Sequence, residues 1–544
     1  MTTVFAGRFV TMAWLAAHLV SPEVSLAQSI LRFSLPFGQH AVGYRSVVLL
    51  DHSRNVPRDT VDAIGNPVVA PRPRPVHLSV WYPAGSSTGK PMLYRDYLAL
   101  YGPSLQIPAA AAGRASEEAL LRWQNLLVRN PGVSLGTRRD SLRTAIAREG
   151  GLPTHSLRDA PPDGQPHPLV LYAAGAEGPS FENDVLMEYL ASLGYVAVGV
   201  PSWTEAGGPF LTTPSSLETQ ARDLELALRY ARELPGEAAQ RAAVIGWSWG
   251  GLASVVVASR NQSVSAVVGL DASVRYFWHD PALRDKIEIS HPYATPTLLI
   301  NQGGTPMTVI AQLGADTTFA FFESLRYADA YQVTMRNLRH QNFAAMYDRL
   351  AGPQPQFFVS DGEALSKGYT TMAAYVAAFL NAYLSGNAAA KQSLGATPSQ
   401  LGLPDTNVSV IRKTGLRPLP TMAAFRAALG PDGWPQAPAI IERLLALDRD
   451  YTIHRDSLEF TGSTLLDSDR GPDGLGVYRV YTKLYPTDAR AWNGLADAYV
   501  TVGDTTRAIA GYREALRLVP TNGRAISGLK RLGKSPTPEQ PNDR

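Results

Sequence analysis

Short apolar runs alternate with amphipathic helical stretches over residues 28–384. The runs that we expect to form strands are rich in Val, Leu and Ala and lie at 168–173, 195–200, 242–245, 264–270, 297–300 and 331–335. Residues 76–82 (VHLSVWY) alternate apolar and polar side chains, which predicts an earlier, antiparallel strand. This order is typical of an α/β fold with a mostly parallel sheet flanked by helices.

Other regions interrupt or end this pattern. Residues 89–165 are helical in character and rich in Ala, Leu and Arg, and we expect this insertion to form a helical cap over a site. Residues 385–420 are rich in Gly, Ser, Asn, Pro and Thr, which predicts a linker. The remainder predicts a small all-α domain at 421–534 and a disordered polar tail at 535–544.

The carboxy-terminal domain carries a pattern of large and small residues at fixed spacing. It resembles a tetratricopeptide repeat in the positions of Trp492, Leu495, Ala496, Tyr499, Gly503, Ala508, Tyr512, Ala515 and Pro520. About one repeat length of 34 residues earlier, Tyr478 and Pro486 occupy the positions of Tyr512 and Pro520. Such repeats imply either a protein partner or packing against the chain's own α/β domain.

The amino terminus has the pattern of an export signal over residues 1–27. A basic residue, Arg8, precedes a mostly apolar run at 9–20, and small residues flank Leu26 directly before Gln28. The apolar run is shorter than the roughly 20 residues that a membrane span needs. We therefore expect an exported protein, periplasmic or secreted, with no transmembrane segment; a buried helix is the alternative.

Composition narrows the chemistry. The 544 residues include 50 Lys and Arg against 47 Asp and Glu, a formal net charge of +3, which gives no electrostatic case for binding nucleic acid. The chain has no Cys, so a catalytic thiol, a thiolate zinc site and disulfides are excluded. A nucleophile in this protein must be an oxygen or nitrogen group.

The segment Gly246-Trp247-Ser248-Trp249-Gly250 lies between the expected strand 242–245 and a helix that begins near residue 252. A serine in a strand-to-helix turn needs small residues two positions before and after it, so that the turn can close. Such a nucleophile elbow exposes the hydroxyl and directs the amino terminus of the helix towards a developing oxyanion. An ordinary tight turn is the alternative explanation.

A serine nucleophile needs a base, and in this fold the base follows the acid in the chain. The histidines after Ser248 are His279, His291, His340 and His454. His340 follows the last expected strand of the parallel sheet, where a loop returns above its carboxyl edge, and is the predicted base. His279 lies in an aromatic, charged loop; the other two stand before a strand or beyond the predicted linker.

The predicted acid is Asp271. It ends the strand 264–270, one element after the elbow, and can therefore reach the same imidazole. The next strand, 297–300, runs into Asn301-Gln302-Gly303-Gly304 and supplies no carboxylate. Asp316 and Glu323 are weaker candidates because neither ends a strand.

Two backbone N–H groups are expected to hold the oxyanion. One belongs to Trp249, directly after the serine, and the other to Ala176, in the loop that follows the strand 168–173. The aromatic side chains of Trp247, Phe277 and Trp278 are candidates for an acyl or leaving-group pocket. Core packing explains each of these aromatic residues equally well.

With these segments in place, residues 38–383 resemble the plasma-type (isoform II) platelet-activating factor acetylhydrolase and dienelactone-hydrolase-like branch of the α/β hydrolases. The resemblance rests on residues 72–75 (RPRP) leading into 80–84 (VWYPA), the elbow GWSWGG, Gly269-Leu270-Asp271 and His340-Gln341-Asn342-Phe343. The family places its acid where Asp271 stands. The family's usual His-Gly in the oxyanion loop is here Ala174-Gly175, which keeps the glycine.

The resemblance implies a serine hydrolase that cleaves carboxylic esters with short or oxidised acyl groups, including lipid esters, without a metal or other cofactor. No His/Asp cluster in the sequence has a spacing that demands a metal. A peptidase or a polyester hydrolase could use the same residues. An inactive hydrolase scaffold that carries a repeat-based binding module is an alternative of a different class.

Overall fold

The computed structural model describes residues 33–55, 60–61, 67–68, 73–86, 88–100, 135–204, 212–234, 237–284, 293–312, 314–350, 362–405 and 407–536. The predicted export signal, residues 101–134 of the predicted cap, His291 and residues 537–544 of the predicted tail lie outside these ranges. The chain divides into two compact units, Met1–Gly415 and Leu416–Arg544.

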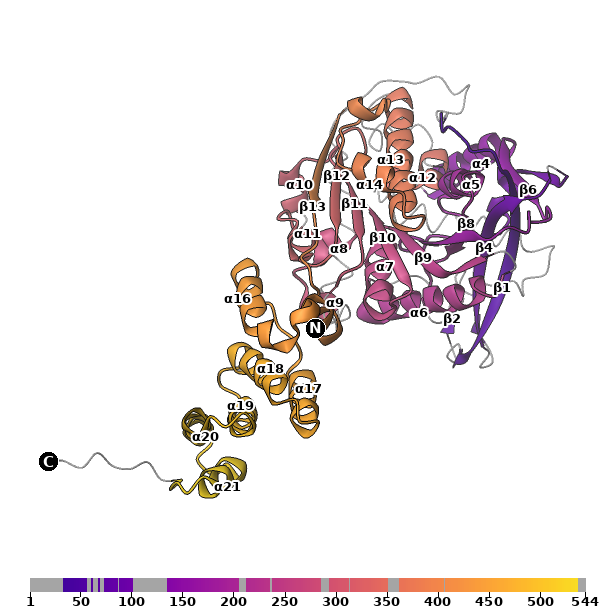
Figure 1. Cartoon of the computed structure of the whole chain (residues 1–544). Coiled ribbons are helices and arrows are strands. Elements are labelled where there is room, and N and C mark those ends of the chain that lie inside the picture. The colour runs from indigo at the N-terminus through magenta and orange to yellow at the C-terminus, as the bar shows by residue number, and fades with distance from the viewer. Residues whose placement is uncertain are drawn as a thin grey trace. The chain divides into compact units, whose positions relative to one another are not determined.

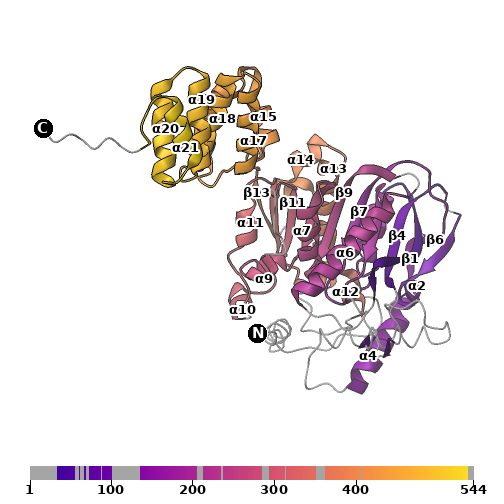
Figure 2. The same cartoon turned by 90° about the horizontal axis from the view of Figure 1, so that it is seen from below.

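The first unit is built on one large sheet (Figures 1 and 2). Its strands are β1 (Ala41–Asn55), β4 (Pro73–Ala84), β5 (Lys90–Leu93), β6 (Pro153–Arg158), β7 (His167–Ala173), β8 (Val196–Val200), β9 (Glu237–Trp247), β10 (Val264–Leu270), β11 (Thr297–Gln302), β12 (Ala330–Met335) and β13 (Val408–Lys413). Their order is β13-β12-β11-β10-β9-β7-β8-β4-β1-β6-β5. The short strands β2 (Thr60–Val61) and β3 (Pro67–Val68) pair only with each other among the described residues.

The central strands β12, β11, β10, β9, β7 and β8 run parallel to one another. Antiparallel strands flank them, with β13 against β12 on one side and β4 against β8 on the other. Because parallel strands end at the same edge, the loops after β9, β10, β11 and β12 meet there. The predicted α/β fold with a mostly parallel sheet is confirmed.

Helices cover both faces of the sheet (Figure 1). In this unit they are α2 (Tyr94–Leu98), α4 (Leu135–Gly150), α5 (Asp184–Ser192), α6 (Pro214–Ala231), α7 (Trp249–Arg260), α8 (Val274–Phe277), α9 (Pro281–Arg284), α10 (Met307–Gln312), α11 (Ala320–Ser324), α12 (Ala345–Leu350), α13 (Gly362–Tyr383) and α14 (Ala388–Ser393). The 3₁₀ turns η3 (His340–Phe343) and η5 (Ser399–Leu401) complete it. Helices α6 and α7 lie on one face, and α5, α12 and α13 lie on the other (Figure 1).

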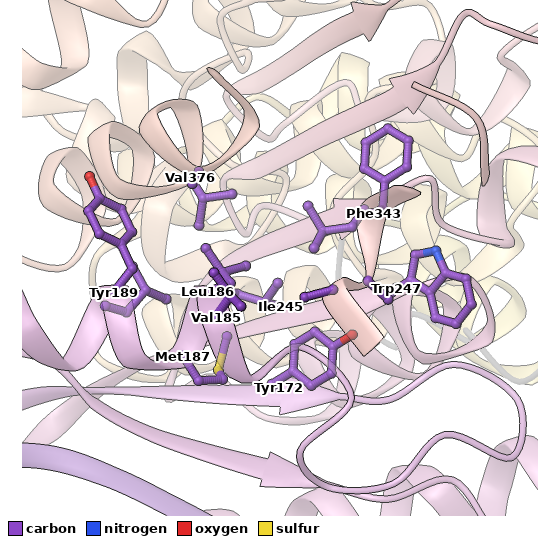
Figure 3. Packing of buried hydrophobic residues seen from close by; sticks show 14 of the residues in the cluster. Tyr172, Val185, Leu186, Met187, Tyr189, Ile245, Trp247, Phe343 and Val376 are labelled. Atoms are coloured by element: carbon purple, nitrogen blue, oxygen red, sulfur yellow. The ribbon is translucent and has the colours of Figure 1, made fainter. Parts of the chain in front are cut away.

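Alternation along the strands divides the core into two clusters. In β7, Leu169 and Leu171 join the cluster that contains α6 and α7, while Val170 and Tyr172 join the cluster that contains α5 and α13. Figure 3 shows part of the second cluster, in which Leu186 from α5 lies close to Ile245 from β9. Both faces of the central strands are therefore buried, which explains their nearly continuous apolar sequence.

The prediction of a linker at 385–420 is wrong. Within that range α14 forms, and β13 pairs in antiparallel register with β12 from Val408 to Lys413, so the first unit extends to Gly415. The strand was missed because it is short and lies at the edge of the sheet, where Val408 and Val410 are only partly buried against the core. Turn-forming residues on both sides of the strand predict irregular structure for the whole region.

The predicted cap at 89–165 is in part an extension of the sheet. Strands β5 and β6 pair with each other, and β6 pairs in parallel with β1. Only α2 and α4 are helical in the described part of this range. The sequence analysis also missed β1, a 15-residue strand that pairs with β4 along most of its length.

The second unit is helical, as expected. It contains α15 (Met422–Ala428), α16 (Ala437–Leu447), α17 (Arg455–Asp467), α18 (Gly471–Leu484), α19 (Ala489–Thr501), α20 (Thr505–Leu518), α21 (Gly523–Arg531) and the 3₁₀ turns η6 (Gly430–Asp432) and η7 (Trp434–Gln436). A Cβ atom on Gly494 would lie 1.9 Å from the Tyr478 ring, and one on Gly528 would lie 2.3 Å from the Tyr512 ring. The same tyrosine–glycine contact thus recurs about one repeat length of 34 residues later.

Buried charges tie β1 and β4 to α6. The Asp223 carboxylate, fully buried on α6, accepts hydrogen bonds from Arg54 at 2.6 Å and from Arg74 at 2.6 Å. Arg54 also donates to Asp51 at 2.5 Å, and Arg74 donates to the Thr204 carbonyl at 2.6 Å. Such a network is stable only while its charges balance, because burial makes an uncompensated charge costly.

We expect Asp223→Ala to lower the free energy of unfolding by about 3–5 kcal/mol, because it removes the carboxylate that two buried guanidinium groups share. Chemical denaturation followed by tryptophan fluorescence measures this change. Glu218→Ala is the matched control on the same helix: its ion pair with Arg260 is partly exposed and should be worth at most about 1 kcal/mol. Equal effects of the two substitutions would contradict the assignment.

Candidate active site

Ser248 lies in a strained turn between β9 and α7. Its φ is 52° and its ψ is −120°, a conformation that side chains rarely adopt. The turn closes because its neighbours are small: a Cβ atom on Gly246 would lie 2.3 Å from the Gly250 backbone, and one on Gly250 would lie 2.1 Å from the Ala173 carbonyl oxygen. This is the backbone geometry of a nucleophile elbow.

Backbone hydrogen bonds hold the strained serine in place. The Ser248 N–H donates to the Leu270 carbonyl at 3.1 Å, and the Ser248 carbonyl accepts from the Ser273 N–H at 2.7 Å. Both partners belong to the end of β10 and the turn after it. The segment that carries Asp271 therefore also fixes the position of Ser248.

The structure brings together the three side chains of the predicted triad. The Ser248 Oγ atom lies 2.9 Å from His340 Nε2, and His340 Nδ1 lies 2.6 Å from Asp271 Oδ2. Ser248 follows β9, Asp271 follows β10, and His340 begins η3 after β12. Ser248 is buried but still 4% exposed, whereas Asp271 is fully buried. His279, the nearest alternative base in the sequence, is exposed.

The second oxygen of Asp271 has its own partners. Oδ1 accepts hydrogen bonds from the Tyr276 hydroxyl at 2.7 Å and from the Gln302 N–H at 3.0 Å, and it lies 3.6 Å from the Arg275 guanidinium. Burial alone would raise the pKa of Asp271. The bond from His340, the charges of His340 and Arg275, and the Gln302 N–H outweigh burial and hold that pKa below its usual value.

The loop that carries His340 is held from two sides. The Trp247 indole N–H donates to the His340 carbonyl at 2.9 Å, and the His340 N–H donates to Gln302 Oε1 at 3.1 Å. Just before the histidine, the Arg339 N–H donates to Asn342 Oδ1 at 2.8 Å. Asn342 Nδ2 in turn donates to the buried Asp348 at 2.7 Å. These hydrogen bonds therefore fix the backbone that carries the His340 imidazole.

The loop after β7 lies directly against the elbow, as the predicted oxyanion site requires. A Cβ atom on Gly175 would lie 2.3 Å from the Trp247 ring. The Gly175 N–H donates to Glu182 Oε2 at 2.8 Å, and the Gly178 N–H donates to the Gly175 carbonyl at 2.8 Å. In the described part of the chain, no acceptor takes the Ala176 N–H.

The second predicted oxyanion donor, Trp249, is the first residue of α7, and its side chain is fully buried. Its backbone N–H therefore lies at the amino terminus of the apolar helix that directly follows the nucleophile.

The aromatic pocket candidates have different surroundings. Trp247 is buried, with its ring 5.2 Å from the His340 ring and 4.7 Å from the Tyr347 ring, so it packs beneath the site and does not present an open face. Trp278 is partly exposed and packs edge-on against Phe321 at 5.0 Å. Phe277 is also partly exposed. A pocket role for Phe277 and Trp278 stays a prediction.

The sequence analysis missed two residues of this site, Tyr276 and Gln302. Gln302 ends β11, and the sequence predicts no site residue there because the strand supplies no carboxylate. Tyr276 lies five residues after Asp271, on α8. Its hydrogen bond to Asp271 depends on the turn between them, which the pattern of apolar and polar residues does not predict.

Two further observations bear on function. The described residues contain no group of three or more His, Cys, Asp or Glu side chains that could hold a metal ion. No helix in the described ranges combines the length and the hydropathy needed to cross a bilayer.

The parallel sheet, the elbow after β9 and the array at the carboxyl edge define the α/β-hydrolase fold. No protein-family model matches the chain, and no curated protein resembles it in sequence. Among solved structures, the chain is similar to a ferulic acid esterase from Streptomyces cinnamoneus. The identity is 20%, the match covers 71% of this chain and 99% of that chain, and the TM-score is 0.45.

Two buried carboxyls beneath the site differ from Asp271 in their ionisation. Burial raises the pKa of Asp348 to about 8, against the opposing bond from Asn342. Burial also raises the pKa of Glu182 to about 8, against the bonds from Gly175 and Tyr172. Among the described residues neither carboxyl has an ion pair with a basic side chain, so each holds a proton near neutral pH.

The proton on Asp348 makes the stability of the folded protein depend on pH, and Asp348→Asn should reduce this dependence. Between the ordinary pKa of Asp, near 4, and about 8, the folded state binds more protons than the unfolded state. Raising the pH through this window therefore lowers the free energy of unfolding. The neutral amide removes the Asp348 contribution, so the variant should be more stable than the parent at pH 8 by at least about 1 kcal/mol, and similar to it near pH 4.

Urea unfolding at several pH values measures this difference. Asp159→Asn is the control, because it makes the same change in charge at an exposed position with φ of 53°, which Asn tolerates. If Asp348→Asn leaves the slope of stability against pH unchanged, Asp348 is ionised in the folded protein and the assignment is wrong.

Proposed function

We propose that the protein is a serine hydrolase that cleaves carboxylic esters through an acyl-enzyme, with Ser248 as nucleophile, His340 as base and Asp271 as the orienting acid. The observation that carries the proposal is the continuous contact from Ser248 Oγ to His340 to Asp271, at 2.9 and 2.6 Å, on a strained elbow. A structural serine has no need of a strained backbone or of an imidazole held by a buried carboxylate.

The direction of proton transfer follows from the ionised state of Asp271. A carboxylate can only accept, so His340 Nδ1 carries the proton that lies between them. The neutral imidazole then has its lone pair on Nε2, which faces the Ser248 hydroxyl. As the Ser248 oxygen attacks the ester carbonyl, Nε2 takes its proton, and Asp271 stabilises the imidazolium that forms.

The negative charge that develops on the carbonyl oxygen needs two donors. We assign these to the N–H groups of Trp249 and Ala176, supported by the contact of the loop after β7 with the elbow. The imidazolium returns its proton to the departing alkoxide, and the alcohol leaves. Water, deprotonated by the same imidazole, then attacks the acyl-enzyme and releases the acid.

The substrate class rests on the resemblance of residues 38–383 to the acetylhydrolase-like branch. It supports esters with short or oxidised acyl groups, lipid esters among them. The proposed reaction needs no metal or other cofactor.

Ser248→Ala should reduce kcat/KM for 4-nitrophenyl acetate by at least about 10³-fold, because the acyl-enzyme cannot form. Ser259→Ala is the matched control: Ser259 lies near the end of the same helix, where its hydroxyl bonds the Val256 carbonyl at 2.7 Å. The control should retain the parent activity within about twofold. Unchanged turnover in Ser248→Ala would overturn the proposal.

A fluorophosphonate probe tests the nucleophile without reference to any substrate. The parent protein should be labelled at Ser248, as peptide mass mapping would show, and an inactive scaffold should not. Comparison of 4-nitrophenyl acetate, a long-chain 4-nitrophenyl ester, an acetylated phospholipid and a peptide anilide then identifies the substrate class. Preferred cleavage of the anilide would replace the esterase assignment with a peptidase.

A further inference from the structure

The position at the end of β11 is filled by an amide whose polar groups are all bonded within the site. Gln302 is 2% exposed. Its backbone N–H donates to Asp271 Oδ1 at 3.0 Å, its Nε2 donates to the Tyr276 hydroxyl at 2.9 Å, and its Oε1 accepts from the His340 N–H at 3.1 Å and from Thr305 at 2.7 Å. One residue therefore contacts both the acid and the backbone of the base.

The bonding pattern has only one consistent direction. The His340 backbone N–H can only donate, so the atom that faces it must be the amide oxygen of Gln302. The amide nitrogen then faces Tyr276 and donates to its hydroxyl oxygen. Arg275 Nη1 also donates to this hydroxyl oxygen, at 3.1 Å, so the phenolic proton of Tyr276 goes to its one acceptor among the described residues, Asp271 Oδ1. The His340 N–H thus sets the orientation of the Gln302 amide, and Arg275 together with Asp271 sets that of the Tyr276 hydroxyl.

We propose that Gln302 and Tyr276 are positioning residues for the proposed acyl transfer: acting as one unit, they hold Asp271 Oδ1 so that only Oδ2 faces His340. This inference rests on the proposed function. Two donors on Oδ1 fix the rotation of the carboxylate, and the Gln302 amide ties that carboxylate to the backbone of the loop that carries the base. In the described part of the chain neither side chain forms a hydrogen bond with Ser248.

The chemistry at position 302 requires a neutral side chain. A carboxylate there would accept the phenolic proton of Tyr276 and withdraw it from Asp271, and it would add a second anion to a buried site. The amide avoids both effects because it presents a donor to Tyr276 and an acceptor to His340. Burial, followed by the Asp271 charge, raises the pKa of Tyr276 well above its usual value, so the phenol keeps its proton.

The charged and titratable groups around Asp271 come from two elements besides its own turn. Arg275 and Tyr276 face it from α8, and His340 faces it from η3. The Arg275 guanidinium donates to the Tyr276 hydroxyl at 3.1 Å and lies 4.8 Å from the centre of the Tyr276 ring; Tyr276→Phe removes the first contact and keeps the ring of the second.

The test uses Tyr276→Phe, Gln302→Met and the double variant in the full chain. Two quantities are measured for each: the rate of labelling by a fluorophosphonate probe, and the pH profile of kcat/KM for 4-nitrophenyl acetate. Tyr293→Phe is the control, since it removes a buried tyrosine hydroxyl, which lies 3.2 Å from Thr297 Oγ1, away from the array. Circular dichroism checks that every variant is folded.

Each single variant should label about tenfold more slowly than the parent, and the double variant should be no slower than the slower single one, because both remove the same unit. In Tyr276→Phe the acid limb of kcat/KM should also move to higher pH, by about half a unit, because the imidazolium then faces a less compensated carboxylate. Tyr293→Phe should change neither quantity.

Independent, additive losses in the two single variants, or a uniform loss with no movement of the acid limb, would overturn the inference and leave a merely structural role. Should Gln302→Met fail to fold, the limb shift in Tyr276→Phe alone decides. A parent protein that the probe does not label would instead refute the proposed function, so the two failures are distinguishable.

Discussion

A charged carboxylate held in a fully buried position is the constraint on which this site depends. Asp271 is out of contact with solvent, and burial alone would neutralise it. It stays ionised because His340 bonds one oxygen while Tyr276 and the Gln302 N–H bond the other, with the Arg275 charge 3.6 Å away. A neutral carboxyl could offer His340 a proton and so invert the tautomer on which the approach to Ser248 depends.

The sheet makes this arrangement geometrically simple. Four neighbouring parallel strands, β9, β10, β11 and β12, end at one edge, and each contributes one residue there: Ser248, Asp271, Gln302 and His340 in chain order. Strands in a sheet lie about 4.8 Å apart, so side chains from adjacent ends are already within reach of one another. β9 and β12 are not adjacent, so the loop after β12 must bring His340 back to Ser248. The turns at Ser248 and Asp271, both with positive φ, complete the arrangement.

Most of this architecture was accessible from the sequence because it depends on local pattern. The buried strands are apolar on both faces, and the elbow is marked by glycines around Ser248, so the fold class and the meeting of Ser248, Asp271 and His340 could be predicted. The edge strand β13 could not, because it is short, has no fully buried side chain and lies among turn-forming residues. The role of Gln302 could not be predicted either. It depends on hydrogen bonds to three residues from separate elements, and the spacing of these residues in the sequence does not show that they meet.

Asp271 and Asp348 are both buried, yet the pKa of Asp271 is lowered and that of Asp348 is raised. The difference comes from the hydrogen-bond donors around each carboxyl. Asp348 receives one neutral amide donor, from Asn342, and its second oxygen is buried with no hydrogen-bond partner among the described residues. Burial therefore prevails, and Asp348 keeps its proton near neutral pH. A carboxyl that supports the loop is thus best neutral, whereas the one that faces the imidazole must be charged. The two carboxyls therefore differ in charge because Asp271 accepts several hydrogen bonds, whereas Asp348 accepts one.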